Sequence, residues 1–229
     1  MKDPSRIQIV KHPVRIGPGA VKLTVHPGDV AAKRNRAEIV ILPQCPLERE
    51  NWYGWSMLIP KDYEDYPGQR GFQIMGQFHA RPDSLEGEKW GNFPPYPPMI
   101  SVQYGRDRTG QGFGLFYGLE KARRRIAVCF IEKGKWYDIK LAVRWSKTDQ
   151  GYVSAWINGE PWTPFNGRDW KCHGANMYNN VPPLLKLGLY RDFGFTTVNS
   201  VYYDEVRIGS REQDVLLPNQ PGHKAIRIR

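Results

Sequence analysis

The sequence predicts an all-β protein built as a sandwich of two sheets. Three observations lead to this class. The 229-residue chain contains 23 glycines and 19 prolines, residues that favour turns. Aromatic residues, which are enriched in strands, make up 13% of it. Short stretches with strand-like character recur along the whole chain, as they do in sandwich folds.

The predicted strands are short and evenly spread. They cover Ala20 to Val25, Ala37 to Leu42, Trp52 to Ile59, Phe72 to His79, Met99 to Tyr104, Phe113 to Tyr117, Arg125 to Ile131, Trp136 to Trp145, Tyr152 to Ile157, Leu184 to Arg191 and Val201 to Ile208. From Tyr137 to Trp145 every second side chain is apolar, which predicts one buried face. The pair Asn158-Gly159 predicts a hairpin turn, because both residues accept a positive φ. With no repeat and no linker-like stretch, we expect one domain over residues 1–229.

The formal net charge of +10 favours anionic partners. Nucleic acid, an anionic membrane surface and an acidic glycan would all fit this charge, but the chain has no recognised nucleic-acid-binding motif. No uninterrupted apolar run approaches the roughly 20 residues that span a bilayer. Residues 1–19 also lack the apolar block of a signal peptide. We therefore expect neither a nucleic-acid nor a membrane partner.

The cysteines and histidines predict no metal site and no disulfide framework. Three cysteines leave at least one thiol unpaired and cannot form a four-cysteine zinc site. The five histidines are scattered, and only His173 lies beside a cysteine, Cys172. A structural role is therefore the favoured interpretation of that pair.

Two long segments between predicted strands are rich in aromatic residues and proline. They run from Pro82 to Pro98 and from Pro161 to Pro183, the second with Trp162 and Trp170. Ordered loops of this length usually form lids or binding walls. The densest basic run, residues 123–125, is interpreted as a solvated strand end rather than a binding patch.

Three predicted strands carry a polar face opposite an apolar one. The polar faces hold Gln73, Met75, Gln77 and His79; Lys186, Gly188 and Tyr190; and Arg34, Arg36 and Glu38. Taken singly, each has a structural explanation: an exposed strand end, a bulge at the glycine, or a surface ion pair between Arg36 and Glu38. Taken together, three strands whose polar sides offer arginine, glutamine, histidine, lysine and tyrosine predict a functional face, on which arginine would suit a carboxylate because its planar fork matches two oxygens.

The same residues carry a resemblance to a known family. Arg36-Ala37-Glu38-Ile39, Gln77-Phe78-His79 and the segment 186–190 (Lys-Leu-Gly-Leu-Tyr) resemble, in order, the Arg-x-Glu-Leu, Gln-x-His and Lys-x-Gly-x-Tyr strands of jelly-roll polysaccharide lyases. The likeness extends through residues 52–60 and 201–209 and is greatest to the heparin-lyase-I-like and glucuronan-lyase-like group, with further similarity to alginate lyases. It implies a concanavalin-like β-jelly roll with a concave substrate cleft.

The resemblance implies β-elimination on an anionic, uronate-containing polysaccharide of the glucuronan, alginate or glycosaminoglycan type. Arg36 and Gln77 are the candidates for neutralising the C6 carboxylate, and His79 and Tyr190 for moving the protons. The expected substrate-binding residues are Lys186, Arg34, Gln73 and Arg191. In glucuronate or mannuronate one phenol could serve as base and then acid. In guluronate or iduronate, His79 would be the base and Tyr190 the acid.

Further expectations follow from the same resemblance. We expect no cofactor in the chemistry, a monomer, and a secreted or periplasmic protein whose export signal is absent from this chain. Related lyases often hold a structural calcium ion, to which Asp204 could contribute an oxygen ligand, although the sequence shows no calcium loop.

Two other functions fit the same fold class. A noncatalytic carbohydrate-binding module would keep the cleft, but would not need a histidine and a tyrosine together. A glycoside hydrolase would need two carboxylates across the scissile bond. The acidic pairs suit that geometry poorly, because Asp204 and Glu205 are strand neighbours, while Glu86 and Glu88 lie in the Pro-rich segment.

Overall fold

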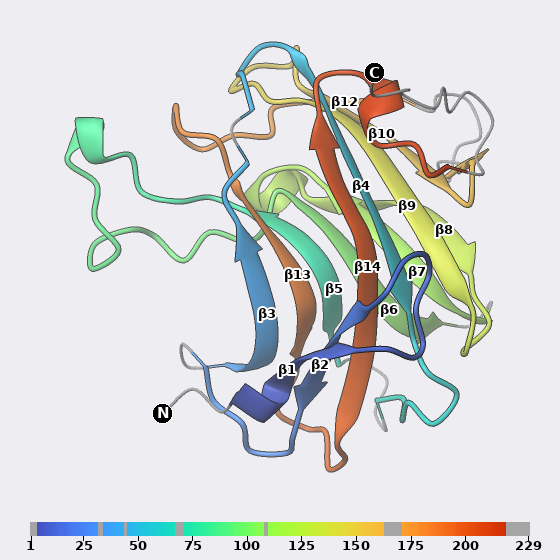
Figure 1. The fold of residues 1–229 in the computed structure, drawn as a ribbon. Helices are drawn as coiled ribbons and strands as arrows, with labels where there is room; N and C mark the ends of the chain where they lie inside the picture. Colours follow the sequence, from blue (N-terminus) through green and yellow to red (C-terminus); the bar gives the residue numbers. More distant parts are fainter. Residues whose placement is uncertain are drawn as a thin grey trace.

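The computed structural model describes residues 4–31, 34–43, 45–66, 71–107, 110–162 and 171–218. Over these residues the chain forms two antiparallel sheets packed face to face (Figure 1). This confirms the predicted all-β jelly-roll sandwich. The described helices are 3-10 turns at Pro4–Arg6, Ser84–Glu86, Glu120–Ala122 and Glu212–Asp214. No helix in this part of the chain is long and apolar enough to cross a membrane.

We call the two layers the back sheet and the front sheet. The back sheet has the order β1 (Ile7–Val10), β2 (Ala20–Val25), β14 (Asn199–Gly209), β4 (Glu50–Leu58), β9 (Trp136–Arg144), β10 (Tyr152–Ile157) and β11 (Glu160–Pro161), with β12 (Lys171–His173) also paired to β10. The front sheet has the order β3 (Asn35–Ile41), β13 (Leu184–Arg191), β5 (Gln73–His79), β6 (Ile100–Asp107), β7 (Gly110–Tyr117) and β8 (Arg124–Phe130).

Every predicted strand is present, with ends that differ by at most a few residues. The sequence did not predict β1, β11 and β12, which are short. β1 has four residues and buries little, and its Ile9 is 77% exposed. Asn158 and Gly159 have φ values of 53° and 87° and close the predicted hairpin between β10 and β11. Trp170, expected in a binding wall, lies outside the described residues.

The core lies between the sheets and is joined by large aromatic side chains. Trp145, fully buried at the end of β9, donates its indole N–H to the Tyr53 hydroxyl over 2.8 Å. Tyr53 of the back sheet meets Phe78 of the front sheet edge to face, with ring centroids 4.7 Å apart. Burying each such ring stabilises the fold by roughly 1.5–3 kcal/mol. These contacts fix the spacing of the two layers.

A register shift in β5 determines which of its side chains face outward. Against β6, the pairing slips between Ile74 and Gly76. Phe72 and Ile74 therefore line the outer face before the shift, and Gln77 and His79 line it afterwards. The residues between them face the core. The prediction that side chains alternate without interruption from residue 72 to residue 79 is therefore wrong for the first half of this segment.

Gly188 in β13 allows the neighbouring strand to approach. Its φ is 149°, and the pairing with β5 shifts beside it. A side chain built on Gly188 would place its Cβ 2.2 Å from the Ala37 carbonyl oxygen. Only glycine combines this φ with that contact.

We expect Gly188→Ala to lower the free energy of unfolding by about 3 kcal/mol, because it adds backbone strain and a clash with β3. Urea unfolding measures this change. Gly105→Ala is the matched control, since a Cβ there meets no atom within 4 Å. Equal stability of the two variants would contradict the assignment of Gly188.

Candidate active site

A cavity of about 550 Å³ opens on the outer face of the front sheet. This volume lies within the range of small-molecule and sugar sites. Side chains from the strands of the front sheet and from the Pro-rich segment before β6 surround it. They are Arg34, Arg36, Phe72, Ile74, Gln77, His79, Pro95, Tyr96, Pro97, Pro98, Gln103, Phe116, Arg123 and Tyr190. Gln77, His79 and Tyr190 therefore share one cavity, as the strand faces predicted.

His79 ends β5 with its ring partly buried. Its Nδ1 lies 2.7 Å from the Ala80 carbonyl oxygen. Because a carbonyl only accepts, Nδ1 carries the proton, and the neutral ring keeps its lone pair on Nε2. Burial lowers the pKa of His79, and the nearby charges of Lys186 and Arg36 lower it further, against the opposing effect of the Ala80 carbonyl. The neutral form is therefore favoured at pH 7.

Tyr190 is the second-last residue of β13 and is paired directly with Arg36 of β3. The guanidinium carbon of Arg36 is 5.4 Å from the centroid of the Tyr190 ring, within cation–π range. On another side the ring meets Phe72 edge to face at 5.1 Å. These contacts hold the phenol in place at the cavity.

Glu38 holds both candidate carboxylate-binding residues. Its side chain is only 6% exposed, and it accepts hydrogen bonds from Gln77 Nε2 and, at 3.4 Å, from Arg36 Nη1. Arg36 Nε donates separately to the Ala31 carbonyl oxygen over 3.0 Å. The motif contained Glu38, but the only role predicted for it was a surface ion pair with Arg36. The structure makes it the group that orients Arg36 and Gln77.

Two other cationic residues predicted to bind substrate differ in their position relative to the cavity. Arg34 is exposed and lines the cavity. Lys186 is not a lining residue but lies opposite Gln77 in the β13–β5 ladder. Burial lowers the pKa of Lys186, the carboxylate of Glu38 opposes that change, and Arg36 adds to it. Lys186 therefore acts on the cavity through its charge.

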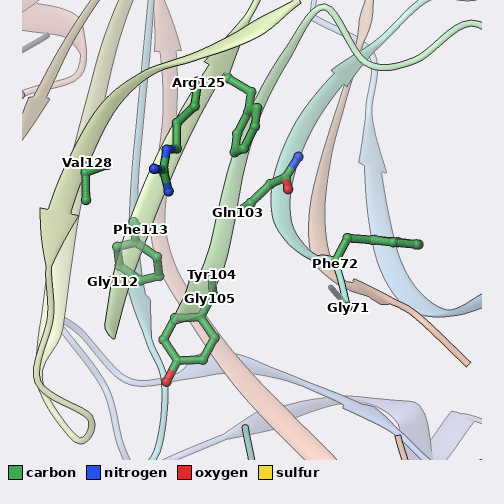
Figure 2. A pocket seen from close by; sticks show the side chains of 11 residues that line it. Gly71, Phe72, Gln103, Tyr104, Gly105, Gly112, Phe113, Arg125 and Val128 are labelled. Carbon is green, nitrogen blue, oxygen red and sulfur yellow. The ribbon is translucent and has the colours of Figure 1, made fainter. Parts of the chain in front are cut away.

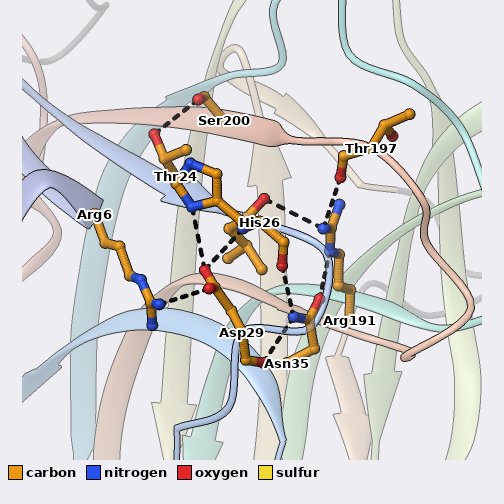
Figure 3. A network of polar contacts seen from close by, with 9 residues as sticks. Arg6, Thr24, His26, Asp29, Asn35, Arg191, Thr197 and Ser200 are labelled. Atoms are coloured by element: carbon orange, nitrogen blue, oxygen red, sulfur yellow. Dashed lines mark hydrogen bonds and ion pairs between the residues drawn. The ribbon is translucent and has the colours of Figure 1, made fainter. Parts of the chain in front are cut away.

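Two predicted substrate-binding residues lie away from the cavity. Gln73 is 2% exposed and accepts a hydrogen bond from the buried Tyr63 hydroxyl, because the shift in β5 turns it to the core. Arg191 is fully buried and donates to Asn35 and to the carbonyl oxygens of Val25 and Thr197 (Figure 3). Arg191 follows Tyr190 and points to the opposite side of β13. The prediction that these two residues line the cleft is therefore wrong.

Arg123 lines the cavity, although the sequence interpretation placed it on a solvated strand end. It donates to the Pro98 carbonyl oxygen over 2.8 Å and to the Ser101 hydroxyl. Its guanidinium carbon lies 4.9 Å from the centroid of the Phe116 ring. Burial lowers the pKa of Arg123. The basic run and the long Pro-rich segment were visible in the sequence, but their meeting depends on the fold.

The Pro-rich segment connects β5 to β6, extends away from the sandwich (Figure 1) and forms one wall of the cavity. Tyr96 in this wall stacks on Tyr178 with ring centroids 3.8 Å apart. The Tyr178 hydroxyl accepts the backbone N–H of Glu120. Both predicted loop segments thus meet at the cavity, one as the wall and the other as its support.

The acidic residues of β14 fit neither a calcium site nor a hydrolase pair. One Asp204 oxygen accepts the backbone N–H groups of Arg15 and Ile16, and the other accepts that of Glu205. Both acids lie on the back sheet, whereas the cavity lies on the front sheet. Across the described ranges no group of three or more His, Cys, Asp or Glu side chains could hold a metal ion.

A family model described as polysaccharide lyase matches residues 1–207. The chain belongs to the polysaccharide lyase family. It is therefore an enzyme that acts on polysaccharides, and the expected resemblance is confirmed. No curated protein matches it.

Solved structures of similar fold include lyases and a hydrolase. The endo-β-1,4-glucuronan lyase of the fungus Trichoderma reesei is 20% identical with a TM-score of 0.70, over 91% of this chain and 88% of that one. An alginate lyase of Pseudomonas aeruginosa is 13% identical with a TM-score of 0.55, over 84% and 83%. A β-glucanase catalytic domain from Podospora anserina is 10% identical with a TM-score of 0.60, over 94% and 84%. At these identities the likeness shows the fold.

We expect the His79 imidazole to titrate below the ordinary histidine pKa of about 6.5. Lys186→Met should raise that pKa, because it removes one cationic neighbour while keeping a long side chain. NMR titration of the imidazole signals, assigned with His79→Gln, measures both values. Lys147→Met, at an exposed lysine after β9, is the control. Equal His79 pKa values in the two lysine variants would contradict the proposed charge effect.

Proposed function

We propose that this polysaccharide lyase cleaves a linear polyuronate by β-elimination and leaves an unsaturated uronide at the new end. One observation carries the proposal: a neutral histidine, a phenol and two carboxylate-binding donors line a single cavity. The same groups are what the elimination of a uronate requires. The family supports the reaction class, and the positive net charge of the chain fits an anionic polymer.

The C6 carboxylate is the first group that the site must hold. Loss of the C5 proton spreads negative charge onto this carboxylate, so donors aimed at it stabilise the transition state more than the ground state. Arg36 and Gln77 are assigned this role, each anchored by Glu38. A donor in such a position contributes about 3–4 kcal/mol in other enzymes.

Proton transfer is assigned to His79 and Tyr190. The lone pair of His79 Nε2 can accept the C5 proton, and the Tyr190 hydroxyl can donate to O4 as the glycosidic bond breaks. This division suits guluronate or iduronate, in which the two leaving groups lie on opposite sides. In glucuronate or mannuronate they lie on one side, and Tyr190 serves as base and then acid while His79 hydrogen-bonds the sugar.

Incubation with glucuronan, alginate or a glycosaminoglycan should produce fragments that absorb in the ultraviolet, because elimination creates a conjugated double bond. Absorbance and reducing ends, followed together, measure the reaction. Carboxyl-reduced polymer is the control and should not react. Reducing ends without absorbance would indicate hydrolysis, and tight binding without either would indicate a carbohydrate-binding protein.

Tyr190→Phe should lower kcat by at least about 100-fold on every polyuronate, since it removes the hydroxyl and keeps the ring. Oligosaccharide binding, measured by calorimetry, should persist. Tyr152→Phe on β10 removes a hydroxyl that bonds Glu50 on the back sheet and should leave kcat unchanged. Undiminished turnover in Tyr190→Phe would exclude Tyr190 from proton transfer.

His79→Gln separates the two routes. It should abolish turnover of a guluronate polymer, in which His79 is the only base. It should reduce turnover of a glucuronate polymer less, because Tyr190 then moves both protons. For wild-type protein on the guluronate polymer, the acid limb of kcat/KM should lie below pH 6.5, since the lowered pKa keeps His79 neutral to a lower pH in the free enzyme.

A further inference from the structure

A second, smaller cavity continues the first one across the front sheet. It has a volume of about 120 Å³ and shares Phe72, Gln103 and Phe116 with the candidate active site (Figure 2). It extends over β6, β7 and β8. Its other lining residues are Gly71, Tyr104, Gly105, Gly112, Phe113, Gly114, Arg125 and Val128. The two cavities together form a groove that crosses the strands.

Glycines make the floor of this second cavity flat. Gly105 of β6 is paired with Gly112 of β7, and Gln103 with Gly114. A Cβ at Gly105 would meet no atom within 4 Å, so packing does not require glycine there. A strand glycine in such open space leaves room for a ligand to approach the backbone. Gly112 is different, because a Cβ there would lie 2.2 Å from the Cys129 carbonyl oxygen.

Arg125 lies over this floor. It is paired with Phe116 across β7 and β8, and its Cδ would be 3.0 Å from a Cβ at Gly114. Figure 2 shows its side chain among those that line the cavity. Arg123 covers the Phe116 ring from the first cavity. Two arginines thus flank one aromatic ring, while Arg124 between them reaches Cys172 instead.

Arg125 is too far from the proton-transfer residues to contact the same sugar. It lies on β8, three strand spacings or about 14 Å from β5, which carries His79, and four spacings from β13, which carries Tyr190. A polymer lying across the sheet would therefore place another sugar over Phe116. An aromatic ring with guanidinium groups beside it suits the apolar face and the carboxylate of a uronate.

We propose that Arg125, Arg123, Phe116 and Gln103 form a second uronate subsite, which binds the carboxylate of a sugar roughly two or three residues from the cleaved bond. The inference rests on the proposed function and deepens it. The enzyme then prefers oligosaccharides that are long enough to place a second uronate over Phe116.

The test compares two variants with the same loss of charge. Arg125→Gln removes the cation over the glycine floor, and Arg124→Gln removes its neighbour on the other side of β8. The probes are hexasaccharides and disaccharides of glucuronan and alginate. Arg125→Gln should raise KM for the cleaved hexasaccharide, and its Kd by calorimetry, about tenfold more than Arg124→Gln does. Disaccharide Kd values should be alike in the two variants.

Gly105→Leu provides a second test, because it fills the floor at a position with open space. It should also weaken hexasaccharide binding, with an unchanged unfolding midpoint. Equal hexasaccharide Kd values in Arg125→Gln and Arg124→Gln would overturn the subsite. Absence of an absorbing product from the wild-type protein would overturn the proposed function instead, while the calorimetric contrast between the two arginine variants would still decide the subsite.

Discussion

The Tyr203 hydroxyl, which reaches from the back sheet, lies 2.5 Å from the Met75 carbonyl oxygen and 3.0 Å from that of Gly188. Both carbonyls sit where the ladder between β5 and β13 is interrupted. A buried carbonyl without a partner would cost about 1–3 kcal/mol, so this contact from the opposite layer lets the interruption persist. Because the interruption persists, Gln77 and His79 face outward together with Phe72 and Ile74. The arrangement of these side chains in the cavity therefore depends on the contact of the Tyr203 hydroxyl.

Charge in the cavity is balanced rather than uniformly positive. Glu38 accepts hydrogen bonds from Arg36 and Gln77 and offsets part of the positive field of Arg36 and Lys186. Without a carboxylate there, the partly buried cations would repel one another and cost stability. With it, Arg36 and Gln77 keep fixed directions, so the donors of the cavity are already oriented.

Alternation along the chain was enough to predict the strands and the faces that carry Arg36, His79 and Tyr190. It failed at Gln73, because a register shift is set by pairing with β6 and β13, and the local sequence continues through it unchanged. Arg191 was misplaced because its partners, among them Thr197, come from other segments. The position of Arg123 likewise depends on contacts with Pro98 and Phe116 that only the fold creates.

The wall that closes one side of the cavity contains Pro95, Pro97 and Pro98, and its Tyr96 is stacked on Tyr178. Prolines have few backbone conformations to lose, and a stacked ring has already given up its rotamer freedom. A wall built in this way is ordered before any sugar arrives. When a flexible polymer binds, conformational entropy is therefore lost by the polymer, whereas this wall of the protein has little left to lose.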